Sequence, residues 1–392
     1  MPIDPARRAA VQTPPSTPYH PPADPERFAA IDRPTLVVDR GRAERNIARM
    51  TAKAAASGVR FRPHFKTHNR VEVGVWFRAA GTTAITVASV EAAELFADAG
   101  WDDITIAFPM VTRALPAIRR LASRISLGVL LDSAESAAVL AAVPDRVDIW
   151  VDVDAGYGRS GAHWDDVNRL ADVASAVDAL PPHRLRGVLT HAGNAYRGPD
   201  RAAITAVWAE TAARLAAARD VLARVTGAAG LEISVGDTPG CCAVERFDGV
   251  DEVRPGNFVY FDLQQLALGA CAEDDLALAI ACPVVAVYPS RGEAVVHGGS
   301  VHLSRDAAPG PGDGSNFGRL AVVEPAGWRL LPADDGHVRS ISQEHGVLRC
   351  SPAVLEQLRV GDLAFIVPAH SCLPANLIRG CQVISPAGPA AG

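Results

Sequence analysis

One lysine in this chain stands where it could form a Schiff base with an aldehyde. Lysine occurs only at Lys53 and Lys66, and the other basic side chains are arginines, which cannot form an imine. Lys66 follows a strand-like run within the sequence RPHFKTH, where Arg62, His64 and His68 could lower the pKa of its ammonium group. Lys53 lies among alanines in an expected helix, so we expect it at the surface. Lys66 is therefore the candidate imine former and base.

A histidine and a cysteine near the carboxyl end could bind a metal ion. His370 and Cys372 follow the strand-like run 363–367, and alternation along a continued strand would place both on one face. Imidazole nitrogen and thiolate suit zinc, but two ligands make only half a site. In isolation, such a pair is more often a buried cysteine beside a core histidine. The polar run SQEHG, which contains Glu344, could orient the pair.

Two turns late in the chain could bind a phosphate group. The run SVGDTPG contains Thr238, and the run RPGN contains Gly256 and Asn257. Both follow strand-like runs, and such loops can present backbone N–H groups and a hydroxyl to an anion. Glycine turns of this kind are weak signals by themselves, because most of them bind nothing.

Further polar side chains fall at or just beyond expected strand ends. His191 or Tyr196 could lie along a cofactor ring, and Arg159 could face a ring nitrogen. Each of these residues alone is more often a loop anchor. The set at these strand ends is Asp152, Asp154, Arg159, His191, Asn194 and Tyr196.

Alternating β-rich and alanine-rich runs must position these residues. Strands are expected at 35–39, 59–66, 83–88, 104–109, 125–132, 147–154, 185–191 and 231–235, and helices at 43–57, 71–80, 90–99, 114–123, 134–142, 165–177 and 202–225. This series predicts an α/β fold with a closed (β/α)8 TIM-type barrel, whose strand carboxyl ends would face the active site. An open doubly wound sheet is the alternative, but no GxGxxG turn follows the first strand.

The pattern changes after residue 262. Short strands at 281–288, 294–297, 319–323, 347–350 and 363–367 alternate with Gly, Pro and Asp breaks, which predicts a smaller, mostly antiparallel β domain. The amino-terminal segment is rich in proline and lacks an apolar core. We therefore expect a mobile arm at 1–26, a cofactor-binding barrel at 27–262 and a β domain carrying the metal ligands at 263–386.

Composition excludes several classes of partner. The net charge of −6 gives no reason to expect binding to nucleic acid or to an anionic membrane. No apolar stretch is long enough to span a bilayer. Seven scattered cysteines without a secretory signal indicate reduced thiols and a cytoplasmic location.

Taken together, these motifs resemble the metal-dependent D-serine dehydratase and D-threonine aldolase family. Its members are fold-type III pyridoxal-phosphate enzymes of the alanine-racemase type, with a barrel followed by a β domain. The resemblance covers nearly the whole chain after the arm, and RPHFKTH and HSC are its most specific parts. The other matching runs are PTLVVD, NIARM, VDAGYGR, HAGN, GDTPG, RPGN and EHG.

The resemblance implies roles for individual residues. Lys66 would carry pyridoxal 5'-phosphate, Thr238, Gly256 and Asn257 would contact its phosphate, Arg159 and Tyr196 would contact its ring, and His370 and Cys372 would bind zinc or another divalent metal. A small amino-acid substrate and a homodimer with its site at the interface are also implied. Two residues depart from the family pattern: Phe65 replaces a small residue, and Asn69 replaces a frequent lysine. Phe65 flanks Lys66, so we expect an effect on substrate size.

The resemblance further implies a reaction. Histidine and cysteine at 370 and 372 look like the dehydratase variant, whereas aldolases usually have aspartate at the second position. The expected activity converts a D-3-hydroxy amino acid such as D-serine to a 2-oxo acid and ammonia, with Lys66 removing the α-proton and zinc polarising the β-hydroxyl. The alternatives are an aldolase acting on D-threonine or 3-hydroxyaspartate, a racemase, and a non-catalytic pyridoxal-phosphate carrier. The second domain, with His370 and Cys372, argues against a carrier.

Overall fold

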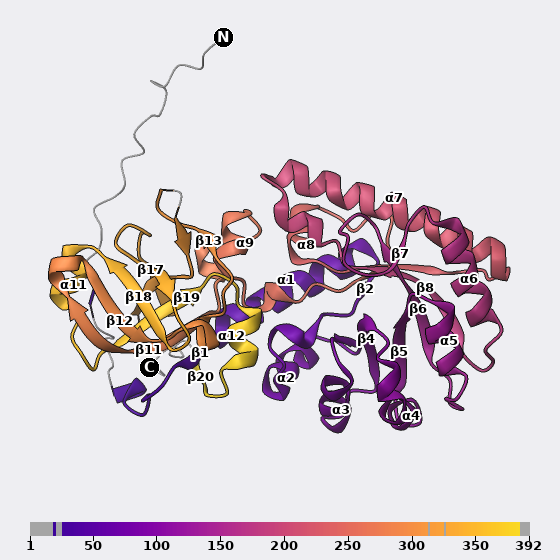
Figure 1. The fold of residues 1–392 in the computed structure, drawn as a ribbon, viewed down its shortest axis with the longest axis horizontal. Helices are drawn as coiled ribbons and strands as arrows, with labels where there is room; N and C mark the ends of the chain where they lie inside the picture. The colour runs from indigo at the N-terminus through magenta and orange to yellow at the C-terminus, as the bar shows by residue number, and fades with distance from the viewer. Residues whose placement is uncertain (1–18, 21–25, 313, 325–326, 385–392) are drawn as a thin grey trace, which may run out of the picture.

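The computed structural model describes residues 19–20, 26–312, 314–324 and 327–384. It contains two domains side by side, a barrel wrapped by helices and a mostly antiparallel β domain (Figure 1). Most of the expected amino-terminal arm lies outside the described residues. Tyr19, which falls within that arm, is buried in the core.

The first domain is a parallel barrel. Its strands run in the order β2 (Arg60–Phe61), β10 (Glu252–Val253), β9 (Glu232–Val235), β8 (Arg184–Thr190), β6 (Asp148–Asp154), β5 (Ser126–Leu131), β4 (Asp103–Pro109) and β3 (Ile85–Val87), with β7 (Ala162–His163) added to β6. The ring closes where His64 forms a parallel bridge with Thr86, whose N–H donates to Pro63 O at 2.9 Å. The predicted eight-stranded TIM-type barrel is confirmed.

Helices cover the outside of this barrel. They are α1 (Arg40–Ser57), α2 (Val71–Ala79), α3 (Val90–Asp98), α4 (Leu115–Ala122), α5 (Ala134–Leu140), α6 (Val167–Asp178), α7 (Arg201–Thr226) and the short α8 (Thr238–Ala243). Many begin at a side chain that caps the first turn: Ser89, Ser133 and Asp200 each accept a backbone N–H there. These caps explain why the expected helix starts are close to the observed ones.

The second domain is a closed antiparallel barrel. Its ring is formed by β11 (Leu278–Tyr288), β12 (Glu293–His297), β18 (His345–Cys350), β17 (Gly336–Ile341), β15 (Gly318–Glu324) and β19 (Leu363–Pro368), and β16 (Gly327–Leu330) pairs with β15. The remaining elements are α9 (Leu263–Ala267), α10 (Ser300–Leu303), β13 (Ala308–Pro309), β14 (Ser315–Asn316), α11 (Pro352–Gln357), α12 (Cys372–Leu377) and β20 (Cys381–Ile384). The predicted β domain is confirmed.

The strand expected at 35–39 lies in the β domain and not, as expected, in the parallel barrel. β1 (Thr35–Asp39) pairs antiparallel with β11 and parallel with β20, so it extends the β-domain sheet instead of opening the parallel barrel. Its run TLVVD is almost fully buried, and either sheet could bury it, which is why composition could not assign it. The parallel barrel still has eight strands because β10, only two residues long, completes it.

Buried ion pairs fasten the amino-terminal end of the parallel barrel. The fully buried Glu252 accepts from Arg62 at 2.8 Å and from Ser234 Oγ at 2.7 Å, and Arg62 also contacts Asp103 at 2.6 Å. This network holds β2, β9 and β10 together where the strands are shortest. Within the described part of the chain, no helix combines the length and apolarity needed to cross a bilayer.

Candidate active site

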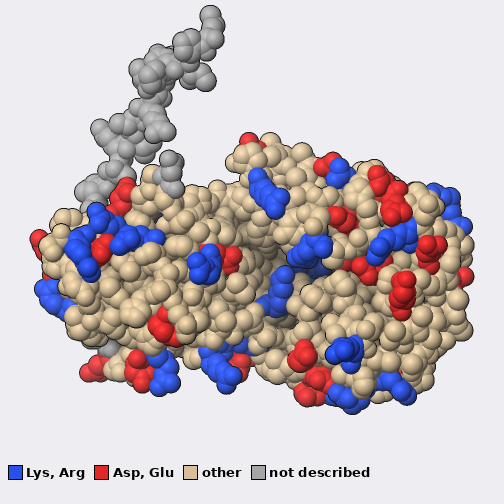
Figure 2. Space-filling view, in the orientation of Figure 1, with Lys and Arg blue, Asp and Glu red and all other residues tan. Residues whose placement is uncertain are grey.

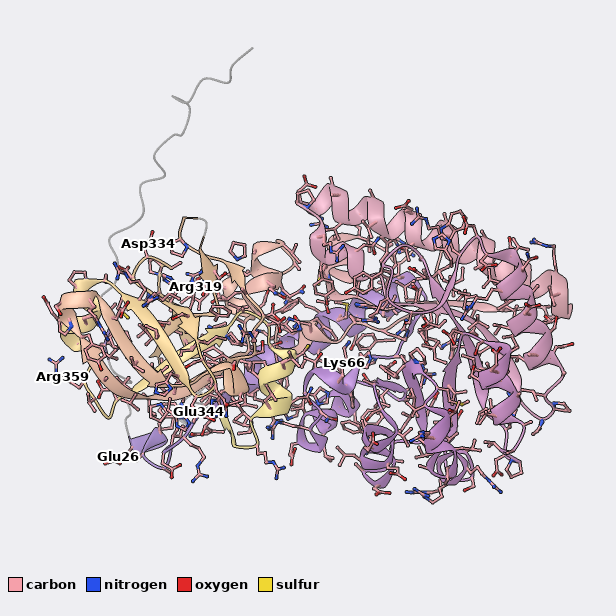
Figure 3. The ribbon with its side chains drawn as sticks, in the orientation of Figure 1. Glu26, Lys66, Arg319, Asp334, Glu344 and Arg359 are labelled. Atoms are coloured by element: carbon pink, nitrogen blue, oxygen red, sulfur yellow. The ribbon has the colours of Figure 1, made fainter. Side chains whose placement is uncertain are left out.

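A cavity of about 680 Å³ opens where the carboxyl ends of the parallel strands meet the β domain. Figure 2 shows a hollow between the two domains with basic side chains on its wall, and Figure 3 places Lys66 at this junction. All residues expected to contact the cofactor or the metal line the cavity: Lys66, Arg159, His191, Tyr196, Thr238, Gly256, Asn257, His370 and Cys372. Of the other polar residues expected at strand ends, Asp152 lines it, whereas Asp154 and Asn194 do not. Both domains therefore contribute to one site.

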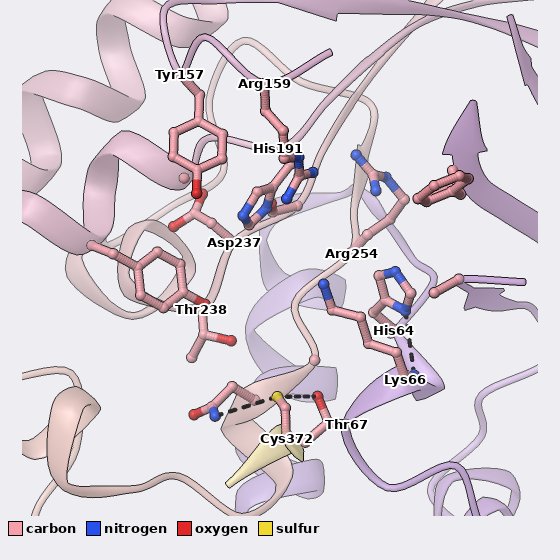
Figure 4. A pocket seen from close by; sticks show the side chains of 18 of the residues that line it. His64, Lys66, Thr67, Tyr157, Arg159, His191, Asp237, Thr238, Arg254 and Cys372 are labelled. Carbon is pink, nitrogen blue, oxygen red and sulfur yellow. Dashed lines mark hydrogen bonds between the residues drawn. The ribbon is translucent and has the colours of Figure 1, made fainter. Parts of the chain in front are cut away.

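Lys66 lies in the short 3-10 turn Phe65–Thr67, just beyond the β2 strand. Its backbone N–H donates to His64 Nδ1 at 3.4 Å, and its carbonyl accepts from Asn376 Nδ2 of α12 at 2.9 Å. Gly256 packs tightly here, since a Cβ at this position would lie 2.8 Å from both His64 O and Thr67 Oγ1. These contacts fix the turn so that the amine of Lys66 points into the cavity (Figure 4).

The protein lowers the pKa of the Lys66 amine. The side chain is exposed to the solvent of the cavity, but protein atoms surround it, and this burial is the main cause of the decrease. The neighbouring Cys372 opposes the shift, while the charges of Arg159 and Arg254 add to it. A lowered pKa raises the fraction of neutral amine, which is the form that reacts with an aldehyde or accepts a proton.

The residues flanking Lys66 divide into two groups. His64 lines the cavity, as expected. Arg62 does not, because it points to the opposite end of the barrel, towards Asp103 and Glu252. His68 is buried against aromatic rings and also does not line the cavity, so the prediction that both side chains act on Lys66 is wrong.

The two departures from the family pattern have structural explanations. Phe65 is fully buried and packs against Phe77, Phe96 and Trp101 with ring centroids 4.9–5.2 Å apart. It does not line the cavity, so the expected effect on substrate size has no structural basis. Asn69 has φ 47°, a left-handed conformation that asparagine adopts more readily than lysine does.

His370 and Cys372 meet beside Lys66, but not by strand alternation. The strand β19 ends at Pro368, His370 lies in the following turn, and Cys372 begins α12. Cys372 Sγ lies 3.4 Å from Thr67 Oγ1. Burial raises the pKa of the Cys372 thiol, but the adjacent His370 outweighs this effect and the pKa is lowered overall. Burial lowers the pKa of His370, but Cys372 and Asp262 outweigh it and raise that pKa well above its usual range. Once its proton is lost, the pair offers nitrogen and sulfur, the donor types that zinc prefers.

Sequence reasoning missed a buried carboxylate behind this pair. Asp262 is fully buried, and its Oδ2 lies 3.0 Å from His370 Nδ1. The same oxygen accepts from the N–H of Ser371 at 2.9 Å and from Asn257 Nδ2 at 2.6 Å. Carboxylates that contact the outer nitrogen of a ligating histidine fix the orientation of its ring. The only sequence signal is that Asp262 precedes the helix α9, which it caps.

Thr238 and Asn257 line another part of the cavity. Thr238 begins α8, where Asp237 caps the helix by accepting the N–H of Gly240. The hydroxyl of Thr238 is buried without a hydrogen-bond partner among the described residues. The side-chain amide of Asn257 instead faces Asp262 and Ser371, which places it near Cys372.

A neutral histidine lies on the far wall. His191 Nδ1 lies 2.5 Å from Gly236 O, and because a carbonyl can only accept, Nδ1 carries the proton and Nε2 is left unprotonated. Burial and the charge of Lys66 lower the pKa of His191 to about 3. Its ring lies 6.1 Å from that of Tyr196 and 5.5 Å from that of Tyr157.

Arginines supply positive charge to the cavity, which is lined by Arg159, Arg197 and Arg254. Arg159 is exposed within it, with its guanidinium 5.3 Å from the centre of the Tyr157 ring. Arg254, which was not expected to act as a site residue, is buried and donates from Nε to Ser234 Oγ at 2.7 Å and from Nη2 to Thr190 O. Burial lowers the pKa of Arg254 to about 10, so it keeps its charge at neutral pH.

Two other expectations are corrected. Lys53 is half-buried and not a free surface lysine, because its Nζ donates to Cys241 O at 2.6 Å and to Val244 O. Glu344 does not orient His370, since it lies beside His297 and His302 instead. Neither Lys53 nor Glu344 lines the cavity.

The site thus combines three features at the mouth of a parallel barrel: the amine of Lys66, the pair His370 and Cys372, and fixed positive charges. Comparison with known proteins shows which class of enzyme has this arrangement. Residues 38–264 match the alanine racemase N-terminal domain, and residues 277–384 match a putative serine dehydratase domain. The chain belongs to the D-serine dehydratase and D-threonine aldolase family of fold-type III pyridoxal-phosphate enzymes. It is accordingly a lyase.

Individual relatives cover almost the full length of the chain. It is 34% identical over 374 residues to D-threo-3-hydroxyaspartate dehydratase from Delftia sp. (strain HT23), covering 93% of this chain and 97% of the relative. It is 28% identical to D-threonine aldolase from Arthrobacter sp, with coverage of 93% and 92%. The solved Delftia dehydratase superposes with a TM-score of 0.83 at 32% identity, covering 91% and 96% of the two chains. A cysteine-to-alanine mutant of that enzyme has been solved in a metal-free form.

Proposed function

We propose that this protein is a pyridoxal-phosphate- and zinc-dependent dehydratase that converts a D-3-hydroxy amino acid to a 2-oxo acid and ammonia. One observation carries the proposal: Cys372 Sγ lies 3.4 Å from Thr67 Oγ1, so the thiolate of the β domain adjoins the residue next to Lys66. A base for the α-proton and a pair of metal ligands for the β-hydroxyl thus lie in the same cavity.

The residues present fit the cofactor. Lys66 supplies an amine with a lowered pKa, and the buried Thr238 hydroxyl without a partner is suited to a phosphate oxygen. Gly256 leaves room for the close approach of the turn that carries Lys66. Other parts of the cavity are lined by Tyr196, His191, Arg159 and Arg254. These side chains would contact the cofactor ring and balance the negative charge of the phosphate.

The residues present also fit a zinc ion. His370 and Cys372 offer nitrogen and sulfur, Asp262 supports His370 from behind, and the open cavity leaves coordination positions for water or substrate. When bound, the cofactor would supply an electron sink and the metal a Lewis acid for the β-hydroxyl.

The chain's own residues account for substrate binding and proton movement. The neutral form of Lys66 Nζ can take the α-proton, because burial and the two nearby arginines disfavour its charged form. Arg159 is exposed in the cavity and can bind the α-carboxylate of the substrate. Neutral His191 presents an unprotonated Nε2 and does not compete for that anion.

The choice of dehydration over aldol cleavage rests on Cys372. A thiolate favours zinc, whereas the aspartate usual in the aldolases favours harder ions such as manganese or magnesium. D-Serine is the first candidate substrate, followed by D-threonine and 3-hydroxyaspartate, and the similarity to the Delftia dehydratase supports the last of these.

A product assay tests the proposal. The protein loaded with cofactor and zinc is incubated with D- and L-serine, threonine and 3-hydroxyaspartate. We expect a 2-oxo acid and ammonia from a D-substrate; glycine and an aldehyde would instead establish an aldolase.

Lys66→Ala should abolish both this activity and the yellow absorbance of the bound cofactor. Lys53→Ala, the control at the other lysine, should weaken the packing of α1 but keep the yellow colour. Colour that survives Lys66→Ala would refute the assignment.

We also propose that the enzyme is a cytoplasmic homodimer. All seven cysteines are free, which fits a reducing compartment. Phe108 and Val111 are 53% and 47% exposed and line an apolar hollow of about 210 Å³ beside the cavity mouth. Covering these side chains with a second copy would remove apolar surface from water. Light scattering should give twice the mass of the chain, and Phe108→Arg should shift it to the monomer.

A further inference from the structure

The β domain carries a second group of metal-ligating side chains, away from the cavity. It consists of His297 at the end of β12, His302 in α10 and Glu344 in the turn between β17 and β18. One ligand atom from each residue lies within 4.8 Å of the other two. Figure 3 shows Glu344 within the β domain, while Lys66 lies at the domain junction.

We propose that His297, His302 and Glu344 form a second divalent-metal site, suited to zinc. Glu344 Oε2 lies 3.4 Å from His297 Nε2 and 3.9 Å from His302 Nε2. Zinc bonds of about 2.0–2.2 Å to nitrogen and oxygen would place neighbouring tetrahedral ligand atoms about 3.3–3.6 Å apart. The distance between Glu344 and His297 already matches this range. A small movement of the half-exposed Glu344 side chain would bring its distance to His302 into the range as well.

The backbone holds the three residues in place. Gly298 N–H donates to Glu344 O at 2.9 Å, and Ser300 N–H donates to Ser342 O at 2.7 Å. The segments pack so closely that a Cβ at Gly299 would lie 2.3 Å from Gln343 O. Because the backbone segments are fixed in this way, binding would require the ordering of side chains and not of the loop, which limits the loss of conformational entropy.

The surroundings also supply negative charge and space for a cation. The carboxylate of Glu344 supplies the negative charge. A surface hollow lined by both histidines leaves room for water at a remaining position; its other charged residues are Asp32, Arg33 and Arg379.

The hydrogen bonds around the histidines indicate that this site would bind a metal ion more weakly than the site at Cys372. Histidines that bind metals usually donate their other ring N–H to an acceptor, but His302 Nδ1 is buried without a partner among the described residues. The first site contains a thiolate and has Asp262 behind its histidine. A chelator should therefore remove the ion at His297, His302 and Glu344 first.

The position of this site suggests a structural role. Helix α10, which carries His302, packs against α12. Helix α12 begins at Cys372, and its Asn376 donates to Lys66 O at 2.9 Å. An ion bound to His302 would thus stiffen the support of the helix that borders the cavity without contacting the substrate.

Metal counting on the full-length protein tests this inference. We expect two zinc ions per chain after equilibration with excess zinc, and one in Glu344→Gln and in His302→Asn. Glu356→Gln, the same substitution at an exposed glutamate of α11, should keep both ions. Far-ultraviolet circular dichroism of each variant verifies that the fold is intact.

Cobalt substitution separates the two sites. Of the two sites, only the one at Cys372 can give a cobalt–thiolate charge-transfer band in the near ultraviolet. Glu344→Gln should therefore keep that band and lose only the part of the visible absorbance that comes from the second site. Cys372→Ser should lose the near-ultraviolet band and keep the visible absorbance of the cobalt ion at His297, His302 and Glu344. That ion should remain bound even if the Cys372 site no longer binds metal. Metal content and affinity that are unchanged in both Glu344→Gln and His302→Asn would overturn the second site.

Discussion

Asp262 gives the sharpest test of whether His370 and Cys372 bind a metal ion. Its Oδ2 receives three contacts, from His370 Nδ1, the Ser371 N–H and Asn257 Nδ2, and its Oδ1 accepts the N–H of Gln265 at 3.0 Å. Asp262→Asn is nearly isosteric, but an amide has only one oxygen. Whichever way the amide is turned, its NH₂ group faces a donor, and the negative charge behind His370 is lost.

The expected cost follows from these contacts. Replacing a carboxylate that orients a ligating histidine typically lowers metal affinity by about 10- to 100-fold. This corresponds to roughly 1.4–2.8 kcal/mol, since each factor of ten is about 1.4 kcal/mol. We expect zinc affinity at the Cys372 site to fall by that amount, while the yellow absorbance of the cofactor on Lys66 persists.

Competition with a zinc-binding dye measures this affinity. Both proteins should carry Glu344→Gln, so that only one zinc site is counted. Asp220→Asn, at an exposed aspartate of α7 that pairs with Arg219, is the matched control and should bind zinc as the parent does. A zinc affinity of Asp262→Asn within twofold of the parent would show that His370 is not oriented by Asp262, or is not a ligand.

Three further outcomes are expected. Glu252→Ala should destabilise the barrel by about 3 kcal/mol in denaturant unfolding, because it removes a fully buried carboxylate and leaves Arg62 paired only with the partly exposed Asp103. Burial raises the pKa of Glu252 but Arg62 lowers it further, so the stabilisation is present above about pH 4.5 and is lost as pH falls through the lower folded-state pKa. Equal stability of variant and parent at pH 7 would contradict this. Phe65→Ala should cost about 3–5 kcal/mol through the cavity it leaves, with KM for the substrate unchanged; a changed KM at intact fold would show that Phe65 does reach the substrate. Cys372→Asp should shift metal preference from zinc towards manganese in competition dialysis, and unchanged zinc preference would argue against Cys372 as a ligand.

Most of the fold could be predicted from periodicity. Alternating β-rich and alanine-rich runs indicated the parallel barrel because each strand is buried and each helix has one buried face. β1 could not be assigned to one of the two sheets, because a run of buried apolar residues contains no information about which strands pair with it. β10 was too short to stand out, and its pairing with β2 and β9 is a tertiary property.

The site was predictable where a residue type limits the chemistry. Only two lysines were available, and only one follows a strand end, so Lys66 could be singled out from the sequence. Side-chain direction was less accessible: Arg62 and Lys66 are close in sequence but point to opposite ends of the barrel. Asp262 could not be found because its partner His370 lies over a hundred residues further on, and only folding brings them together.

The location of β1 has a consequence for motion between the domains. The chain starts in the β-domain sheet, leaves it through α1, and returns to it at β11, so two covalent segments join the two bodies. A double connection resists the twisting and sliding that a single hinge would permit. The amine on one body and the thiolate on the other should therefore keep their spacing through turnover. Cutting the gene after residue 262 would leave the second fragment without β1, and the first fragment with β1 but neither of the strands that pair with it.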